Sequence, residues 1–273
     1  MNTTCTIGNV TVGTGRLVVI AGPCLAESID LCKQTAGTLA EVCSRLDIGL
    51  VFKASYDKAN RSSGSSHRGP GLAKGLGMLG EIAEQFDVPV LSDVHETSQI
   101  PAAAEVLDAI QIPAFLCRQT DLLLAAGESG KAVNIKKGQF MAPWDMAGAV
   151  EKVRLEGNDN VLITERGTSF GYNRLVTDFR AIPQMQAHAP VCFDATHSVQ
   201  EPGGLGHASG GQRQYVTTLA GAAMAAGADA LFIETHPEPA NALSDAACQV
   251  PLAEMEDLLK RCQRLFEAAK AVE

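Results

Sequence analysis

The sequence predicts an α/β protein with a (β/α)8 (TIM) barrel, and three observations lead to this prediction. Eight short apolar runs alternate with longer segments rich in Ala, Leu and Glu. The runs are continuously apolar, as expected for the strands of a parallel sheet with both faces covered. A chain of 273 residues has the length at which such barrels commonly form one domain. We therefore expect a single barrel domain over residues 1–273.

The expected strands are rich in β-branched residues and run into turns or polar segments. They span residues 17–22, 49–55, 88–94, 108–115, 132–138, 160–167, 190–197 and 230–236. Helical patterns lie between them, notably at residues 28–46, 71–86, 143–157, 213–227 and 251–272. An open flavodoxin-like sheet is the alternative, but it would leave the last three strand–helix units without a role. No GxGxxG motif follows the first strand, which also disfavours an open sheet.

The N-terminal residues 1–16 are expected to form a short β-hairpin that turns at Gly8–Asn9 and closes the bottom of the barrel. They lack the charged segment and apolar run of a secretory signal. The most apolar stretch, residues 219–233, is interrupted by Asp229 and too short to span a bilayer. We therefore expect a cytoplasmic protein with no membrane partner.

Charge and cysteine usage narrow the function classes further. The formal net charge is −9, which argues against nucleic acid as a partner because phosphate backbones select basic surfaces. The eight cysteines are scattered and form no CxxC pair. Most of them are therefore expected to be reduced and buried rather than joined in disulfides.

Polar side chains gather where the expected strands end. The carboxyl ends of all strands in a barrel share one face, and the chemistry of such proteins takes place there. Charged groups are costly to bury, so a purely structural explanation would need each of them to be paired. Eight polar strand ends together favour an active site. The residues are Cys24, Lys53, Ser55, Asp93, His95, Gln111, Lys136, Lys137, Glu165, Arg166, Asp194, His197, Glu234 and His236.

Two cations follow neighbouring strands, Lys136 the fifth and Arg166 the sixth. The forked donor of a guanidinium and the point charge of an ammonium together suit a phosphate group. The alternative is that salt bridges to Glu165 or Asp93 hold both. The pair predicts an anion site at one side of the barrel mouth.

A second group follows the seventh, eighth and first strands, which are adjacent in a closed barrel. Cys24, His197 and Glu234 would meet there, and Asp245 in the following loop could add a fourth ligand. One sulfur, one nitrogen and two oxygens suit a divalent transition metal. No compact motif such as HExxH supports this, so a buried cysteine beside an unrelated histidine is an equal alternative.

A long polar loop, residues 56–71, follows the second strand and carries Lys58, Asn60, Arg61 and Ser62. Such a composition is typical of a solvated, flexible loop. Its basic residues, hydroxyls and glycines also suit a lid over a second phosphate group.

Several stretches resemble the 3-deoxy-D-manno-octulosonate 8-phosphate (KDO 8-phosphate) synthase family. They are FKASYDKANRSS, SDVHE, IQIPAFLCRQTDL, NIKKGQF, ERGTSFGYNRLVTDFR, FDATHSVQ, GGQRQ and FIETHPEPANALSD. The resemblance runs from about residue 17 to about residue 255, and the KANRSS loop separates this family from related barrels. It implies a (β/α)8 enzyme.

The resemblance implies a transferase of KDO (lipopolysaccharide) biosynthesis that condenses phosphoenolpyruvate with D-arabinose 5-phosphate and water. Its products would be 3-deoxy-D-manno-octulosonate 8-phosphate and inorganic phosphate. Lys136 and Arg166 would hold the phosphate of phosphoenolpyruvate, with Lys53 and Gln111 near the reacting atoms. A homotetramer is implied, in which Arg118 approaches the site from a neighbouring subunit. The other substrate-binding residues implied are Lys58, Asn60, Arg61, Ser62, Asp93, Ala114 and Phe115.

Cys24 distinguishes the two classes of this family. Metal-independent members carry asparagine at this position, whereas metal-dependent members have cysteine in an AGPC-like context, and SDA at residues 244–246 also resembles the metal-dependent pattern. The resemblance therefore implies that Cys24, His197, Glu234 and Asp245 bind Fe2+, Zn2+, Mn2+ or Co2+. With Lys53, the catalytic residues implied are Cys24, His197 and Asp245, and the proton carrier stays open among His197, Asp245 and a metal-bound water.

Two alternative functions remain. A DAHP synthase-like enzyme would condense phosphoenolpyruvate with another aldose, such as erythrose 4-phosphate, and the KANRSS loop argues against it. A non-catalytic barrel would only bind sugar phosphates or metal. The set Lys53, Lys136, Arg166 and His197 argues against this second alternative.

Overall fold

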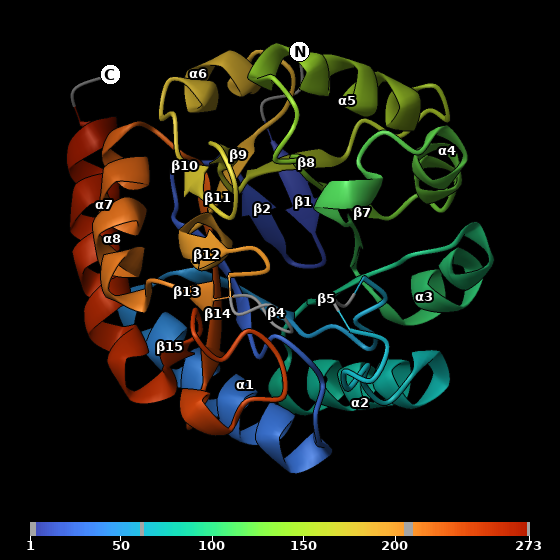
Figure 1. Ribbon diagram of the computed structural model, residues 1–273, viewed down its shortest axis with the longest axis horizontal. Helices are drawn as coiled ribbons and strands as arrows, with labels where there is room; N and C mark the ends of the chain where they lie inside the picture. Colours follow the sequence, from blue (N-terminus) through green and yellow to red (C-terminus); the bar gives the residue numbers. More distant parts are fainter. Residues whose placement is uncertain (1–3, 61–62, 205–209, 272–273) are drawn as a thin grey trace.

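The computed structural model describes residues 4–60, 63–204 and 210–271. Eight parallel strands form a closed barrel, and Figure 1 looks along it with the helices arranged around the strands. The barrel strands are β3 (Val18–Gly22), β4 (Gly49–Lys53), β5 (Val90–Asp93), β6 (Ala109–Ile112), β7 (Ala132–Lys136), β8 (Val161–Glu165), β11 (Val191–Asp194) and β14 (Ala230–His236). The barrel prediction is confirmed, and the open flavodoxin-like sheet is excluded.

Strand β14 closes the barrel. It pairs in parallel with β3, from Ala230 opposite Val18 to Glu234 opposite Gly22, and with β11 on its other side. The seventh, eighth and first barrel strands are therefore neighbours, as the sequence predicted. Every residue of the eight strands is buried, in agreement with their continuously apolar sequences.

A helix follows each barrel strand. The helices are α1 (Ile29–Leu46), α2 (Leu72–Phe86), α3 (Ile100–Val106), α4 (Thr120–Glu128), α5 (Met146–Arg154), α6 (Ala181–Gln186), α7 (Val216–Ala225) and α8 (Met255–Lys270). Helix α1 begins after Ser28, whose hydroxyl accepts a hydrogen bond from Leu31 N, and ends at Asp47 in the left-handed conformation. Three expected helices start later than their patterns because a 3-10 turn precedes each. These turns are η3 (Pro143–Asp145), η5 (Arg213–Tyr215) and η7 (Leu252–Glu254). Among the described residues, no helix is both long and apolar enough to cross a membrane.

Strands β1 (Cys5–Ile7) and β2 (Val10–Val12) form the expected N-terminal hairpin, turning at Gly8–Asn9. Gly8 has a φ of 55°, which glycine adopts at little cost. Cys5, Ile7 and Val12 belong to one buried cluster with apolar residues of the barrel strands. That the hairpin closes the bottom of the barrel, and that the chain is one domain, stay predictions.

The remaining elements lie in the loops that follow the barrel strands. The short strands are β9 (Thr168–Ser169), β10 (Leu175–Val176), β12 (Gln200–Glu201), β13 (Gly210–Gly211) and β15 (Val250–Pro251). The short 3-10 turns are η1 (Thr97–Gln99), η2 (Ala114–Leu116), η4 (His197–Val199) and η6 (Pro239–Asn241).

Side chains alternate between two apolar cores along each barrel strand. In β3, Val18 and Ile20 belong to the core inside the barrel, whereas Val19 and Ala21 pack with the helices. The same alternation in β14 puts Phe232 inside and Ile233 outside. Because the period is two, most of the polar residues at the strand ends fall on the inner side and are directed toward the barrel mouth. Lys137 and Glu165 fall on the outer side, two positions after Ile135 and Ile163 of the outer core.

Candidate active site

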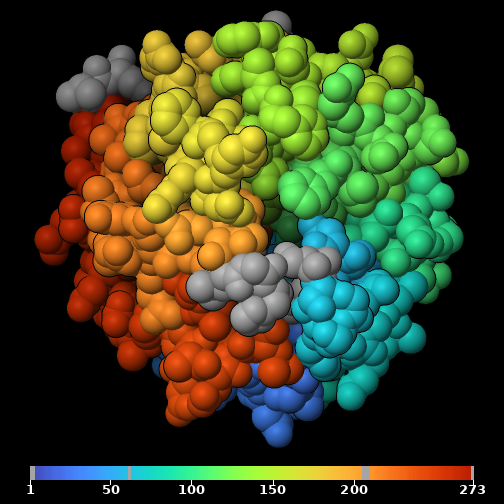
Figure 2. All heavy atoms as spheres, in the orientation of Figure 1, coloured from blue at the N-terminus to red at the C-terminus, as the bar shows by residue number. Residues whose placement is uncertain are grey.

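A cavity of about 540 Å3 lies at the carboxyl ends of the barrel strands. Figure 2 shows this face of the molecule, where the loops after β4 (cyan), β8 (yellow) and β11 (orange) surround the centre. Most of the catalytic, substrate-binding and metal-binding residues that the sequence analysis assigned line the cavity. They are Lys53, Lys58, Asn60, Asp93, Gln111, Ala114, Phe115, Lys136, Arg166, His197, Glu234 and Asp245.

Two of the assigned site residues that the structure describes, Cys24 and Arg118, are not on the cavity wall. Cys24 is fully buried and contacts Asp245, which does line the cavity. Arg118 is exposed on the loop after β6. Arg61 and Ser62 lie outside the described residues.

The anion side of the cavity contains Lys136 and Arg166, from the neighbouring strands β7 and β8. Lys136 Nζ forms an ion pair with Asp194 and lies 3.2 Å from the centroid of the Phe232 ring. Burial lowers the pKa of Lys136, although Asp194 favours its charged form. Arg166 Nη2 donates a hydrogen bond to Gln200 Oε1 over 3.0 Å. Its Nη1 is buried and lacks a hydrogen-bond partner in the described part of the chain, which suits an incoming anion.

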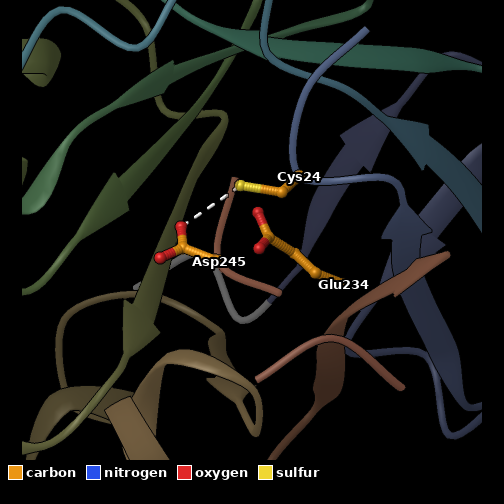
Figure 3. Close-up of side chains that lie close together, drawn as sticks. All are labelled: Cys24, Glu234 and Asp245. Atoms are coloured by element: carbon orange, nitrogen blue, oxygen red, sulfur yellow. Dashed lines mark hydrogen bonds between the residues drawn. The ribbon is translucent and has the colours of Figure 1, made fainter. Parts of the chain in front are cut away.

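Cys24, Glu234 and Asp245 form a compact group of possible metal ligands, shown in Figure 3. The Cys24 sulfur and one oxygen of each carboxylate all lie within 4.8 Å of one another. Cys24 Sγ is 3.2 Å from Asp245 Oδ2. Asp245 has a φ of 47°, so its backbone adopts the left-handed conformation that few residues favour. Strand order and one tight loop conformation thus bring together residues that are far apart in the sequence.

His197 adjoins this group through Glu234. Its Nε2 lies 3.5 Å from Glu234 Oε2, and its Nδ1 lies 2.6 Å from Asp194 Oδ2. Glu234 Oε2 is buried and has no hydrogen-bond partner among the residues described. The imidazole is therefore oriented by Asp194 through one nitrogen, while the other nitrogen faces the group.

The donor set fits a divalent transition metal. Burial raises the pKa of the Cys24 thiol well above its usual value, and the Glu234 carboxylate raises it further. A thiol and two carboxylates converge there, whereas the His197 imidazole only adjoins them, 3.5 Å from Glu234. One oxygen of Glu234 has no hydrogen-bond partner among the described residues. A bound cation would compensate this buried negative charge and favour the thiolate.

Lys53 connects this group to the rest of the cavity. Its Nζ lies 2.6 Å from Glu234 Oε1 and donates a hydrogen bond to the Cys24 carbonyl over 3.1 Å. Burial alone would raise the pKa of Glu234, but the charges of Lys53 and His197 outweigh it and lower this pKa. A buried ion pair with Glu234 thus holds Lys53 in the cavity wall.

Three supporting residues were given no specific role by the sequence analysis. Asp194 pairs with both Lys136 and His197, so it links the anion side to the metal-ligand group. Gln200 accepts from Arg166 and donates to Asp245 Oδ1 over 2.8 Å. Gln249 accepts from Cys24 N over 3.1 Å and donates to Ser244 O over 2.8 Å. Asp194 was visible as a strand-end carboxylate, whereas no sequence pattern marks the two amides.

Asp93, the last residue of β5, is the centre of another hydrogen-bonded network in the cavity. It accepts hydrogen bonds from Ser55 Oγ and pairs with His95 Nε2 over 2.9 Å, and Lys58 Nζ donates to Ser55 over 2.9 Å. Burial alone would raise the pKa of Asp93, but His95 and Lys58 outweigh it and lower this pKa strongly. Burial lowers the pKa of His95, but Asp93 outweighs it and raises this pKa above its usual value.

An Asp93→Asn variant is expected to lose about 2 kcal/mol of stability near pH 6, with a distinctive pH dependence. The loss should shrink below about pH 3.9, because Asp93 then takes up a proton in the unfolded chain while its lowered pKa keeps it charged in the folded protein. It should also shrink as the pH rises through the raised pKa of His95, because the imidazole then loses its charge. Urea unfolding from pH 3 to 9 measures this. Asp178→Asn, which removes the exposed Arg180–Asp178 ion pair, is the control and should leave stability nearly unchanged at every pH. A loss independent of pH would contradict the expectation.

Comparison with known proteins agrees with the motifs. The DAHP synthetase I family model matches residues 2–271. A 2-dehydro-3-deoxyphosphooctonate aldolase of Desulfosudis oleivorans is 56% identical over 98% of this chain and 98% of its own length. The protein of that name from Granulibacter bethesdensis is 56% identical, covering 97% and 95% respectively. One from Trichlorobacter lovleyi is 54% identical, covering 95% and 96%. The chain therefore belongs to the DAHP synthetase I family and, within it, to the KDO 8-phosphate synthases, as the relatives' names show.

Proposed function

We propose that this chain condenses phosphoenolpyruvate with D-arabinose 5-phosphate and water, giving 3-deoxy-D-manno-octulosonate 8-phosphate and inorganic phosphate in KDO biosynthesis. The observation that carries the proposal is that Arg166 Nη1, beside Lys136 in the cavity, is buried and has no hydrogen-bond partner among the described residues. Lys58 and Asn60, from the loop after β4, supply a second polar region in the same cavity. Two phosphorylated substrates match two such regions.

Each substrate is assigned to one region. Lys136 and Arg166 hold the phosphate of phosphoenolpyruvate, with Lys53 and Gln111 near its reacting atoms. Lys58 and Asn60, together with Arg61 and Ser62, bind arabinose 5-phosphate. Further substrate contacts are assigned to Asp93, Ala114 and Phe115, which line the cavity, and to Arg118 of a neighbouring subunit.

The reaction needs orientation and charge stabilisation more than a covalent catalyst. The enol carbon of phosphoenolpyruvate attacks the aldehyde carbon, and the aldehyde oxygen becomes an alkoxide that takes up a proton. Water adds at the carbon that bears the phosphate. The bond between this carbon and the phosphate oxygen then breaks and releases phosphate. Holding the substrates face to face and placing the Lys53 ammonium beside a developing oxyanion would lower the barrier. His197, oriented by Asp194, and Asp245 are positioned to hold or move protons.

We further propose that Cys24, His197, Glu234 and Asp245 bind a divalent metal, Fe2+, Zn2+, Mn2+ or Co2+. Three of these groups converge within 4.8 Å, and one Glu234 oxygen has no hydrogen-bond partner in the part of the chain that the structure describes; both observations support the proposal. When bound, the ion would orient and polarise the aldehyde or the attacking water without redox chemistry.

Phosphate release tests the proposed reaction. Release is expected only when phosphoenolpyruvate and arabinose 5-phosphate are both present, and mass spectrometry should find the eight-carbon product. Faster turnover with erythrose 4-phosphate would favour the DAHP synthase-like alternative. Saturable binding of both substrates without phosphate release would favour a non-catalytic barrel.

We propose a homotetramer, as the family resemblance implies, and exposed aromatic side chains support the presence of a subunit interface. Phe115, Phe140, Trp144, Phe170 and Tyr172 lie in loops after β6, β7 and β8, and Tyr172 is 97% exposed. Large exposed aromatic residues are enriched at subunit interfaces. Arg118 is exposed on the same loop as Phe115, as a residue serving a neighbouring site would be. Light scattering is expected to find four times the chain mass of 28.7 kDa, and a monomer would contradict the proposal.

We also propose that the protein works in the cytoplasm. Its eight cysteines are all buried free thiols, which suits a reducing compartment. The proposed substrates are phosphorylated metabolites, which are made and used inside cells.

A further inference from the structure

Directly behind the anion side of the cavity lies a second pair of charged residues. Lys137 and Glu165 are each one position away from the cavity residues Lys136 and Arg166. The exposed fractions of Lys137 and Glu165 are 0% and 1%, and neither lines the cavity. Because side chains alternate along a strand, Lys136 and Arg166 take the inner side while Lys137 and Glu165 face the helices. Ile135 and Ile163, two positions before Lys137 and Glu165, pack in that outer core.

The contacts of this outer pair join the loops that follow β7 and β8. Lys137 Nζ lies 3.5 Å from Glu165 Oε2 and donates to Thr168 Oγ1 over 3.1 Å. It also approaches the carbonyl oxygens of Gly138 and Met141 at 3.4 Å and that of Gly167 at 3.5 Å. Glu165 Oε1 accepts a hydrogen bond from Gly167 N over 2.7 Å. One ammonium thus holds both loops.

Stability alone does not account for this pair. A buried ion pair can often be replaced by apolar residues without loss of stability, because desolvation cancels much of the attraction. The pair is also incompletely satisfied, since Glu165 Oε2 is buried without a hydrogen-bond partner among the described residues. Its contacts instead constrain the backbone next to Lys136 and Arg166. Fixing the separation of two cations matters for a ligand that both must reach.

We propose that Lys137 and Glu165 are positioning residues that set the spacing of Lys136 and Arg166 for an anionic group. The inference rests on the proposed function, in which Lys136 and Arg166 hold the phosphate of phosphoenolpyruvate. The proposal predicts that substitutions of Lys137 and Glu165 weaken the binding of phosphoenolpyruvate but not of arabinose 5-phosphate, because the arabinose 5-phosphate region follows another strand, β4.

Two variants separate positioning from stability. Lys137→Met leaves Glu165 buried without its partner, so it is expected to lower the melting temperature and to raise the KM for phosphoenolpyruvate about tenfold. Lys137→Met/Glu165→Met leaves no unpaired buried charge, so its melting temperature should return toward that of the wild type. Its KM for phosphoenolpyruvate should stay about tenfold raised, while the KM for arabinose 5-phosphate and kcat change less than threefold. Recovery of both melting temperature and KM in the double variant would overturn the inference.

A matched control removes a charged residue elsewhere. Arg154 on α5 pairs with Asp159 at 3.1 Å and donates to His188 O, and none of these three residues lines the cavity. Arg154→Met is expected to lower the melting temperature without changing either KM. An equal rise in the KM for phosphoenolpyruvate in this control would overturn the inference, because general destabilisation would then explain the effect.

Titration calorimetry with phosphoenolpyruvate alone keeps this test separate from the proposed reaction. The double variant is expected to bind phosphoenolpyruvate about tenfold more weakly than the wild type, and equal affinity would overturn the positioning role. Wild-type protein that binds phosphoenolpyruvate but does not turn it over with arabinose 5-phosphate would contradict the proposed reaction only.

Discussion

Replacing Cys24 with alanine is expected to abolish stoichiometric metal binding and to lower turnover by about a thousandfold. Cys24 supplies the sulfur of the proposed ligand set and contacts Asp245, so the variant loses one ligand and the contact that holds another. A metal that polarises a reacting oxygen contributes several kcal/mol to the transition state, which corresponds to this loss in rate. Elemental analysis after dialysis and phosphate release with both substrates measure the two effects.

A buried cysteine elsewhere provides the control for Cys24→Ala. Cys32 lies on α1, and burial raises its pKa to about 12, so Cys32→Ala removes a comparable thiol away from the cavity. This control is expected to keep one metal per chain and near-wild-type turnover. Chelation should inactivate the wild type, and adding back a divalent metal should restore it but not Cys24→Ala. Stoichiometric metal in Cys24→Ala, or full activity after chelation, would refute the ligand assignment.

The second large effect is expected from Lys53→Met, which should destabilise the metal-free protein by about 3–5 kcal/mol. The substitution leaves the Glu234 carboxylate buried without the ammonium 2.6 Å away. Since Lys53 and His197 lower the pKa of Glu234, the Lys53–Glu234 ion pair stabilises the fold at neutral pH. That contribution is lost as the pH falls below about 4.3, the ordinary pKa of a glutamate. Urea unfolding after chelation measures the change.

Metal loading and an exposed ion pair test this explanation of Lys53→Met. A bound cation would give Glu234 another partner, so the loss should be smaller in the metal-loaded protein. Lys33→Met removes the Lys33–Glu81 pair, whose side chains are 33% and 50% exposed, and should cost less than about 1 kcal/mol. Equal losses in Lys53→Met and Lys33→Met would show that burial of the Lys53–Glu234 pair has no special effect.

Much of the fold could be predicted because its signals are local. Continuous apolar runs predicted all eight barrel strands, and the turn at Gly8–Asn9 predicted the hairpin. Helices α3, α4 and α6, with 7, 9 and 6 residues, were not singled out because such short segments show no clear period. The starts of α5, α7 and α8 were placed early because periodicity does not distinguish a 3-10 turn from the first turn of an α-helix.

Most residues of the candidate site could be predicted from the sequence, but the contacts between them could not. Strand order alone placed Cys24 near Glu234, since the first and last strands of a barrel are neighbours. The sequence also proposed Glu165 or Asp93 as salt-bridge partners of Lys136, whereas the structure pairs Lys136 with Asp194. Each of these carboxylates could pair with the Lys136 ammonium by charge alone, and only the directions of the side chains decide which one does.

The sequence by itself determined the barrel, the face on which the polar strand ends meet and the identity of most groups there. These follow from a period of two along each strand and from the rule that parallel strands share their carboxyl face. The tertiary structure alone decided which groups touch: Gln249 with Cys24, Gln200 with both Arg166 and Asp245, and Lys137 with Glu165 behind the anion side. The physical reason is that such contacts depend on the paths of loops joining residues as far as 225 positions apart, and hydrogen bonds tolerate errors of only a few tenths of an ångström.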